Sequence, residues 1–125
     1  NSKPGEQANT PGFALSKEIS QPSNLKILSN GSSATISWSY SSKGSIKIEY
    51  YRIRGVCTKG GTSCGNFVND IWNIPSSDGA PMSLQITQSM VGNSSSGGQW
   101  KFYISANNQS KSLSAAELSF DPVTL

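Results

Sequence analysis

Apolar residues in this chain recur at every second position, in short runs separated by Gly, Ser, Asn and Pro. Two runs are unbroken: Ala34, Ile36 and Trp38 alternate with Thr and Ser, and residues 100–106 place Trp, Phe, Ile and Ala between Lys, Tyr and Ser. Successive side chains of a β-strand point to opposite faces, so each run predicts a strand with one buried face. No segment shows the 3.6-residue period of an amphipathic helix, and we therefore expect an all-β fold.

Shorter alternating segments, bounded by turn residues, predict the other strands. They cover residues 25–27, 46–57, 67–74, 82–86 and 113–120. Together with the two unbroken runs they predict a sandwich of about seven antiparallel strands. The hydrophobic fraction of only 34% fits such a fold, because Ser, Gly and Asn, which favour turns, take the place of apolar residues.

In their order and spacing these strands resemble the fibronectin type III family of immunoglobulin-like β-sandwiches, over most of residues 22–120. The resemblance implies a spacer or protein-interaction module of a larger secreted or surface protein, such as a bacterial extracellular glycoside hydrolase. Trp100 stands where the family has a corner Tyr. The residues that carry the likeness are Pro22, Asn24, Leu25, Ile27, Ala34, Ile36, Trp38, Tyr51, Ile53, Trp100, Phe102, Ile104, Ala106, Asn108 and Ser110.

The chain divides into a flexible leader, residues 1–20, and one sandwich domain, residues 21–125. Residues 12–20 hold three apolar side chains whose spacing leaves open whether they add a short edge strand. The net charge of +3 is spread along the chain, which gives nucleic-acid binding little support. No apolar run is long enough to span a bilayer, and we expect a monomeric module without a transmembrane segment, within a larger multidomain chain.

Cys57 and Cys64 are the two cysteines of the chain, and they flank a turn at residues 59–62 that contains two consecutive glycines. Paired glycines supply the positive φ angles of a tight hairpin, so the two thiols are expected to lie close together. We predict a disulfide that closes this hairpin, which implies an oxidising compartment and a secreted or cell-surface location. The alternative, a reactive or redox pair, has neither the usual two-residue spacing nor a neighbouring imidazole.

The chain has no histidine, which removes the commonest general base and the commonest metal ligand together. Its seven acidic residues are scattered over the leader, the turns and different strands, and nothing in the sequence pairs them as glycoside hydrolysis requires. We therefore expect a module that is not an enzyme and that needs neither a cofactor nor a metal.

Candidate binding residues come from the outward positions of two strands. If Tyr51 and Ile53 point inward, alternation turns Tyr50, Arg52 and Arg54 outward, onto the face that Lys101 and Tyr103 occupy on a neighbouring strand. Two Tyr rings among three cations suit an acidic protein surface or a sugar. The alternative is that these side chains only decorate a solvated sheet face.

Trp72 is a separate candidate, because it lies in an Asn-rich stretch out of phase with the core pattern. An exposed indole serves as a platform for a sugar ring; the alternative is that Trp72 caps one open end of the sandwich. Exposure of Trp72 beside Tyr or Asn favours a carbohydrate-binding module for chitin or another glycan, and burial removes the main support for that hypothesis. Three N-glycosylation sequons, relevant only in a eukaryotic source, begin at Asn30, Asn93 and Asn108.

Overall fold

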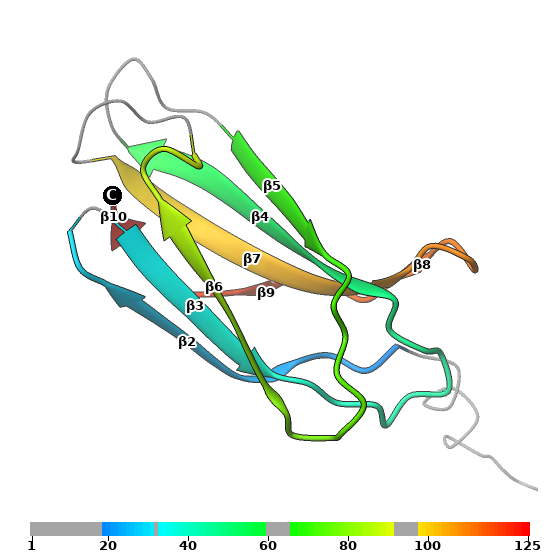
Figure 1. The fold of residues 1–125 in the computed structure, drawn as a ribbon. Helices are drawn as coiled ribbons and strands as arrows, with labels where there is room; N and C mark the ends of the chain where they lie inside the picture. Colours follow the sequence, from blue (N-terminus) through cyan, green and yellow to red (C-terminus); the bar gives the residue numbers. More distant parts are fainter. Residues whose placement is uncertain (1–18, 32, 60–65, 92–97) are drawn as a thin grey trace, which may run out of the picture.

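The computed structural model describes residues 19–31, 33–59, 66–91 and 98–125, and these segments contain nine strands in two antiparallel sheets (Figure 1). One sheet has the order β2–β3–β6; in the other, β10, β7, β4 and β5 follow one another and β8 and β9 also pair with β7. The predicted all-β class is confirmed: the fold is an immunoglobulin-like, fibronectin type III-like β-sandwich. The strands are β2 (Ser23–Ser29), β3 (Ser33–Ser39), β4 (Tyr50–Lys59), β5 (Asn66–Ile71), β6 (Pro81–Thr87), β7 (Gln99–Asn108), β8 (Leu113–Ser114), β9 (Leu118–Ser119) and β10 (Val123–Thr124).

The three shortest strands occupy one strand position, because β8, β9 and β10 pair with β7 one after another. Five positions separate Leu113 from Leu118, whereas four separate their partners Asn108 and Ile104, so one extra residue bulges out between β8 and β9. The predicted last strand is therefore longer than residues 113–120 and interrupted. Counted by position, the sandwich has seven strands, and the bulges blunt this edge against pairing with another chain.

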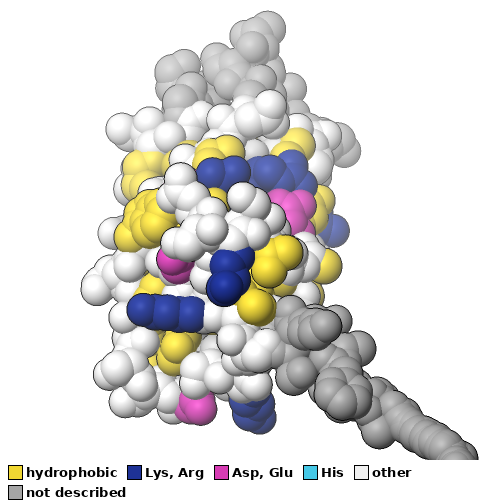
Figure 2. Space-filling view, turned by 90° about the vertical axis from the view of Figure 1, so that its right-hand side faces the viewer, with side chains coloured by type: hydrophobic (Ala, Val, Ile, Leu, Met, Phe, Trp, Pro, Cys, Tyr) yellow, Lys and Arg dark blue, Asp and Glu magenta, His cyan; other side chains and the backbone are white. Residues whose placement is uncertain are grey.

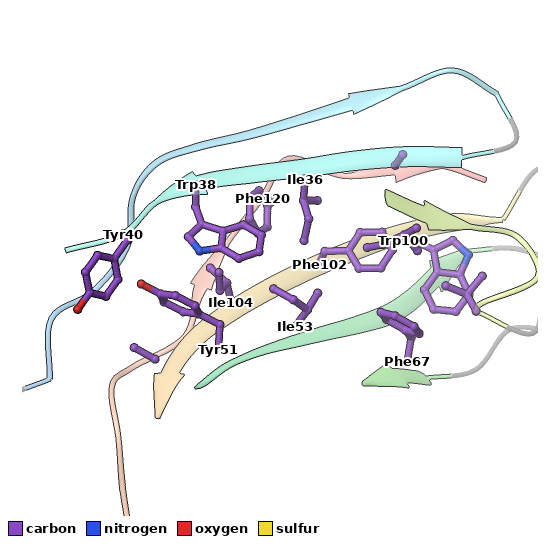
Figure 3. Close-up of a cluster of buried hydrophobic side chains, with 14 of the residues drawn as sticks. Ile36, Trp38, Tyr40, Tyr51, Ile53, Phe67, Trp100, Phe102, Ile104 and Phe120 are labelled. Carbon is purple, nitrogen blue, oxygen red and sulfur yellow. The ribbon is translucent and has the colours of Figure 1, made fainter. Parts of the chain in front are cut away.

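The core lies between the sheets and is built from the inward residues that alternation predicts (Figure 3). Trp38 from β3 meets Tyr51 from β4 edge to face, with ring centroids 5.5 Å apart. Trp100 and Phe102 of β7 are fully buried and stack at 6.1 Å. Because aromatic rings bury large apolar areas, these four side chains stabilise the packing of the two sheets against each other.

Gly55 lies on the inward face of β4, opposite Phe102 in the register of β4 and β7. A Cβ atom at this position would come within 2.5 Å of the Phe102 ring. Phe102 is enclosed by Trp100 on one side and by Phe67, edge to face at 6.3 Å, on the other. The absence of a side chain at Gly55 therefore lets the ring lie against the backbone of β4.

Ile19, which the sequence-based division assigns to the leader, is only 8% exposed and belongs to the core. Its backbone forms an isolated parallel bridge with Ile46. The predicted strand over residues 46–57 is accordingly divided: Ile46 pairs with Ile19, and the regular strand β4 begins at Tyr50.

Three buried polar atoms have no hydrogen-bond partner among the described residues: Nε1 of Trp38, Nε1 of Trp100 and the hydroxyl oxygen of Tyr51. The backbone of Ser41 approaches the Tyr51 hydroxyl, but outside hydrogen-bonding geometry. Trp100 is thus held by packing and by no side-chain hydrogen bond to the described residues. Burial, with a smaller contribution from Tyr40, raises the pKa of Tyr51 to about 12.

Candidate functional site

The predicted binding residues of β4 and β7 lie together on the sheet face that points away from the core, which we call the outer face. Arg54 is directly opposite Tyr103, and Lys101 is opposite Val56, two positions further along β4. The Arg54 guanidinium lies over the Tyr103 ring, 4.5 Å from its centroid, and Arg52 lies 5.8 Å from the centroid of the Tyr50 ring. Cation–π contacts therefore hold both arginines against the sheet.

Two of the three cations on the outer face are paired with carboxylates. Arg52 donates to both oxygens of Asp70, at 2.7 and 3.0 Å, and Arg54 to both oxygens of Glu117, at 2.8 and 2.9 Å. These hydrogen bonds hold the pKa of each carboxyl below its usual value. The outer face is thus less cationic than the sequence suggested, and Figure 2 shows basic side chains interspersed with acidic and hydrophobic ones.

Trp72 continues the outward alternation of β5 by one residue and is 53% exposed. Its indole stacks on the Tyr50 ring with centroids 4.4 Å apart and planes inclined by 27°. The ring is therefore supported from behind by a neighbouring strand while about half of its surface faces solvent. Exposure of Trp72 beside a Tyr is the arrangement that the carbohydrate hypothesis requires.

Trp72 forms part of the wall of a groove of about 610 Å³ at one end of the sandwich, which we call the Trp72 groove. This is the end at which β3, β5 and β7 finish and β4 begins (Figure 1). Both polar and apolar side chains line the groove, as a small ligand with hydroxyl groups requires. Its lining residues are Tyr40, Lys47, Ile48, Glu49, Trp72, Ile74, Pro75, Ser76, Gln109 and Ser110.

Carboxylates fix two of the loops around this end. Glu49 accepts hydrogen bonds from the backbone N–H of Ser110 at 3.0 Å and from its hydroxyl at 2.6 Å. Asp78 does the same for Ser42, at 2.6 and 2.7 Å. Both pairs of bonds lower the pKa of the accepting carboxyl, because they favour its charged form. The Trp72 groove is therefore preorganised, with its loops tied to one another.

Asn108 is buried and connects the turn after β7 to the segment before β4. Its Nδ2 donates to the carbonyl of Lys47, and its Oδ1 accepts from the N–H of Lys111, both at 2.8 Å. An amide used in this way is closed to glycosylation in the folded protein. Asn30 is exposed at the turn after β2, and Asn93 lies outside the described residues.

Sequence reasoning did not single out Glu49, Lys47 or Gln109, because the first two precede β4, the third follows β7, and nothing local marks them as neighbours of Trp72. Cys57 is in β4, whereas Cys64 lies outside the described residues, so the disulfide stays a prediction. In the described segments no three His, Cys, Asp or Glu side chains gather where they could hold a metal ion. These segments also contain no helix with the length and hydrophobicity that crossing a membrane requires.

The likenesses found by comparison with known proteins include a distant structural one. No family model matches the chain, and no curated protein matches its sequence. A solved structure described as "Myokine structure" is similar with a TM-score of 0.47 and 12% identity, covering 86% of this chain and 96% of that one. A likeness this distant assigns neither a family nor a function.

Proposed function

We propose that this chain is a non-catalytic accessory module of a secreted or cell-surface protein, and that its Trp72 groove binds a glycan. The observation that carries the proposal is the half-exposed Trp72, stacked on Tyr50 at the wall of a groove that also has polar groups. The apolar face of a sugar ring packs on an indole, while its hydroxyls require hydrogen-bond partners at the rim. The groove offers both.

Polar groups in the Trp72 groove are available to a ligand. Among the described residues, the side chains of Lys47, Gln109 and Ser76 have no hydrogen-bond or ion-pair partner. Glu49 is held in position by Ser110, so it presents a fixed carboxylate. Rigid placement of Glu49 reduces the entropy lost in ordering the site when a ligand binds.

The proposed family and extracellular location of the module rest on the sequence. Its strand pattern supports membership of the fibronectin type III family, and a disulfide between Cys57 and Cys64 would fit an oxidising, extracellular location. We propose a monomer within a larger chain, without cofactor or nucleic-acid ligand, which attaches an associated domain to a glycan surface.

The second candidate function is protein interaction through the outer face, or a plain spacer role. Val68, which is 55% exposed and opposite the paired Arg54, favours an interaction surface, because an apolar residue among neutralised charges suits an interface core. Because Arg52 and Arg54 are paired with carboxylates, the outer face attracts an acidic partner less strongly than two unpaired arginines would.

Isothermal titration calorimetry with chito-, cello- and xylo-oligosaccharides tests the glycan proposal. We expect one saturable site in the wild type and a loss of about ten-fold or more in affinity in Trp72→Ala. Tyr103→Ala is the matched control, since it removes an aromatic ring of the outer face and leaves the groove intact. Glycan binding that survives Trp72→Ala but is lost in Tyr103→Ala would contradict the proposed site, and no binding by any of these glycans would contradict the proposed function.

A further inference from the structure

A second hollow, of about 330 Å³, lies beside the Trp72 groove. It sits between the end of β5, at the edge of one sheet, and the start of β6, at the edge of the other. Its walls combine apolar surface with one amide and one hydroxyl side chain. The lining residues are Ile71, Asn73, Pro75, Pro81, Met82 and Ser83.

The two hollows lie on either side of the segment that follows β5. Ile71 and Asn73 line the second hollow, Trp72 and Ile74 line the Trp72 groove, and Pro75 lines both. The chain makes a tight turn at Asn73, where the N–H of Ile74 donates to the carbonyl of Trp72 at 3.0 Å, and neighbouring side chains of this turn line different hollows. A ligand longer than the groove can therefore continue past Pro75 and make contacts in the second hollow.

The charges around the two hollows limit the kind of ligand. No ionisable residue lines the second hollow, and the side chains of Asn73 and Ser83 have no hydrogen-bond partner among the described residues. In the Trp72 groove the charged lining residues are Lys47 and Glu49, of opposite sign, so the lining carries no net charge. A ligand with a net charge of either sign therefore gains no excess of opposite charge from the lining.

We propose that the ligand is an oligosaccharide of uncharged sugar residues, which stacks on Trp72 and extends past Pro75 so that a further residue binds between Asn73, Met82 and Ser83. This inference rests on the proposed function and specifies its ligand. The second hollow acts as an additional subsite: Met82 and Pro81 contact the apolar face of the sugar, and Asn73 and Ser83 bond its hydroxyls.

Calorimetry with a disaccharide and a hexasaccharide of the same uncharged series, chito- or cello-oligosaccharide, tests the proposal. We expect the hexasaccharide to bind at least about ten-fold more tightly than the disaccharide. Asn73→Ala should weaken hexasaccharide binding by about five-fold, since one hydrogen bond is lost, and leave disaccharide binding unchanged. Met82→Ser is a second variant at the same subsite and should act in the same direction. Asn73 is exposed, whereas Met82 is partly buried and packs against the core, so the fold of Met82→Ser is checked by circular dichroism before the titration.

An oligogalacturonate hexamer serves as the acidic counterpart. The proposal expects it to bind more weakly than the uncharged hexasaccharide, and expects binding of the uncharged one to change little between low and moderate salt. Equal affinity for short and long chains, no effect of Asn73→Ala, or preference for the acidic hexamer would overturn this inference while leaving glycan binding at Trp72 standing. Failure of both uncharged chain lengths to bind would overturn the proposed function and this inference together.

Discussion

Substitution of Gly55 by alanine tests the packing between β4 and β7. An added Cβ atom lies 2.5 and 2.7 Å from two carbons of the Phe102 ring and 3.4 Å from Cβ of Phe67. Ordinary contact between carbons begins near 3.5 Å, so the ring must move by about 1 Å. Phe102 is fully buried in contact with Trp100 and Phe67, so a shift of its ring displaces these neighbours as well.

The magnitude follows from two opposing effects. Overpacking of one methyl group into a closed core costs about 1–3 kcal/mol. Alanine recovers about 0.5–1 kcal/mol, because glycine loses more backbone entropy on folding. The midpoints of these ranges differ by about 1.3 kcal/mol, so we expect Gly55→Ala to lower the free energy of unfolding by about 1 kcal/mol and the Tm by roughly 4–6 °C.

Urea unfolding followed by tryptophan fluorescence measures this change. The matched control is the double variant Gly55→Ala/Phe102→Leu: the smaller side chain makes room for the methyl group, so Gly55→Ala should cost less in this background than in the wild type. A Gly55→Ala variant as stable as the wild type, or a cost that is the same in both backgrounds, would refute the reasoning.

Three further substitutions test individual contacts. Asn108→Ala should lower the free energy of unfolding by about 1–2 kcal/mol, because it removes two part-buried hydrogen bonds of a buried amide; chemical denaturation checks this, and an unchanged midpoint would contradict it. Tyr51→Phe should be nearly neutral at pH 7, since it removes a hydroxyl without a partner among the described residues. Wild type should then lose stability relative to Tyr51→Phe from about pH 10 to about 12, because the unfolded state ionises first, and parallel pH–stability curves would contradict this. Asp70→Asn should be less stable than wild type at neutral pH, with the difference disappearing as the pH falls below about 4 through the lowered pKa of Asp70; a pH-independent difference would count against the ion pair with Arg52.

The sequence was sufficient for the fold class and for the division of strand residues between core and solvent. Alternation placed Tyr51 and Ile53 inward, and burial of both is complete in the structure. The period-two patterns predict burial correctly here because each sheet has only one face on the core. A register slip by one residue would turn every apolar side chain of a strand to the solvent, so the pattern specifies which residues point inward.

One ion pair could have been predicted from the sequence. Arg52 and Asp70 are each nine residues from Gly61, at the middle of the expected hairpin turn, and they are directly opposite in the structure. By contrast, the pair between Arg54 and Glu117 depends on a bulge in the last strand, which shifts its register against β7. No local signal in the sequence marks that bulge.

The Trp72 groove could not be predicted beyond Trp72 itself. Three of its other lining residues follow Trp72 closely in the chain, but the rest come from the ends of β3, β4 and β7, and these meet only because the two sheets pack with those ends together. Trp72 could be identified from the sequence as a candidate platform for a sugar ring, since it is out of phase with the core pattern. The polar groups around it could not be identified in this way. Three-dimensional placement of loop ends depends on sheet packing, which short-range patterns do not encode.

The central claim, that a glycan binds on Trp72, is tested most directly by a two-dimensional NMR titration that follows the three indole N–H signals. Trp38 and Trp100 are buried, whereas Trp72 is 53% exposed, so a ligand in the groove reaches one of the three rings. The account predicts that an uncharged hexasaccharide shifts the Trp72 signal saturably, together with backbone signals of Glu49 and Gln109, and leaves the other two indoles in place. A Trp72 signal that does not move while other residues of the chain respond to the glycan, or no response anywhere, would contradict it.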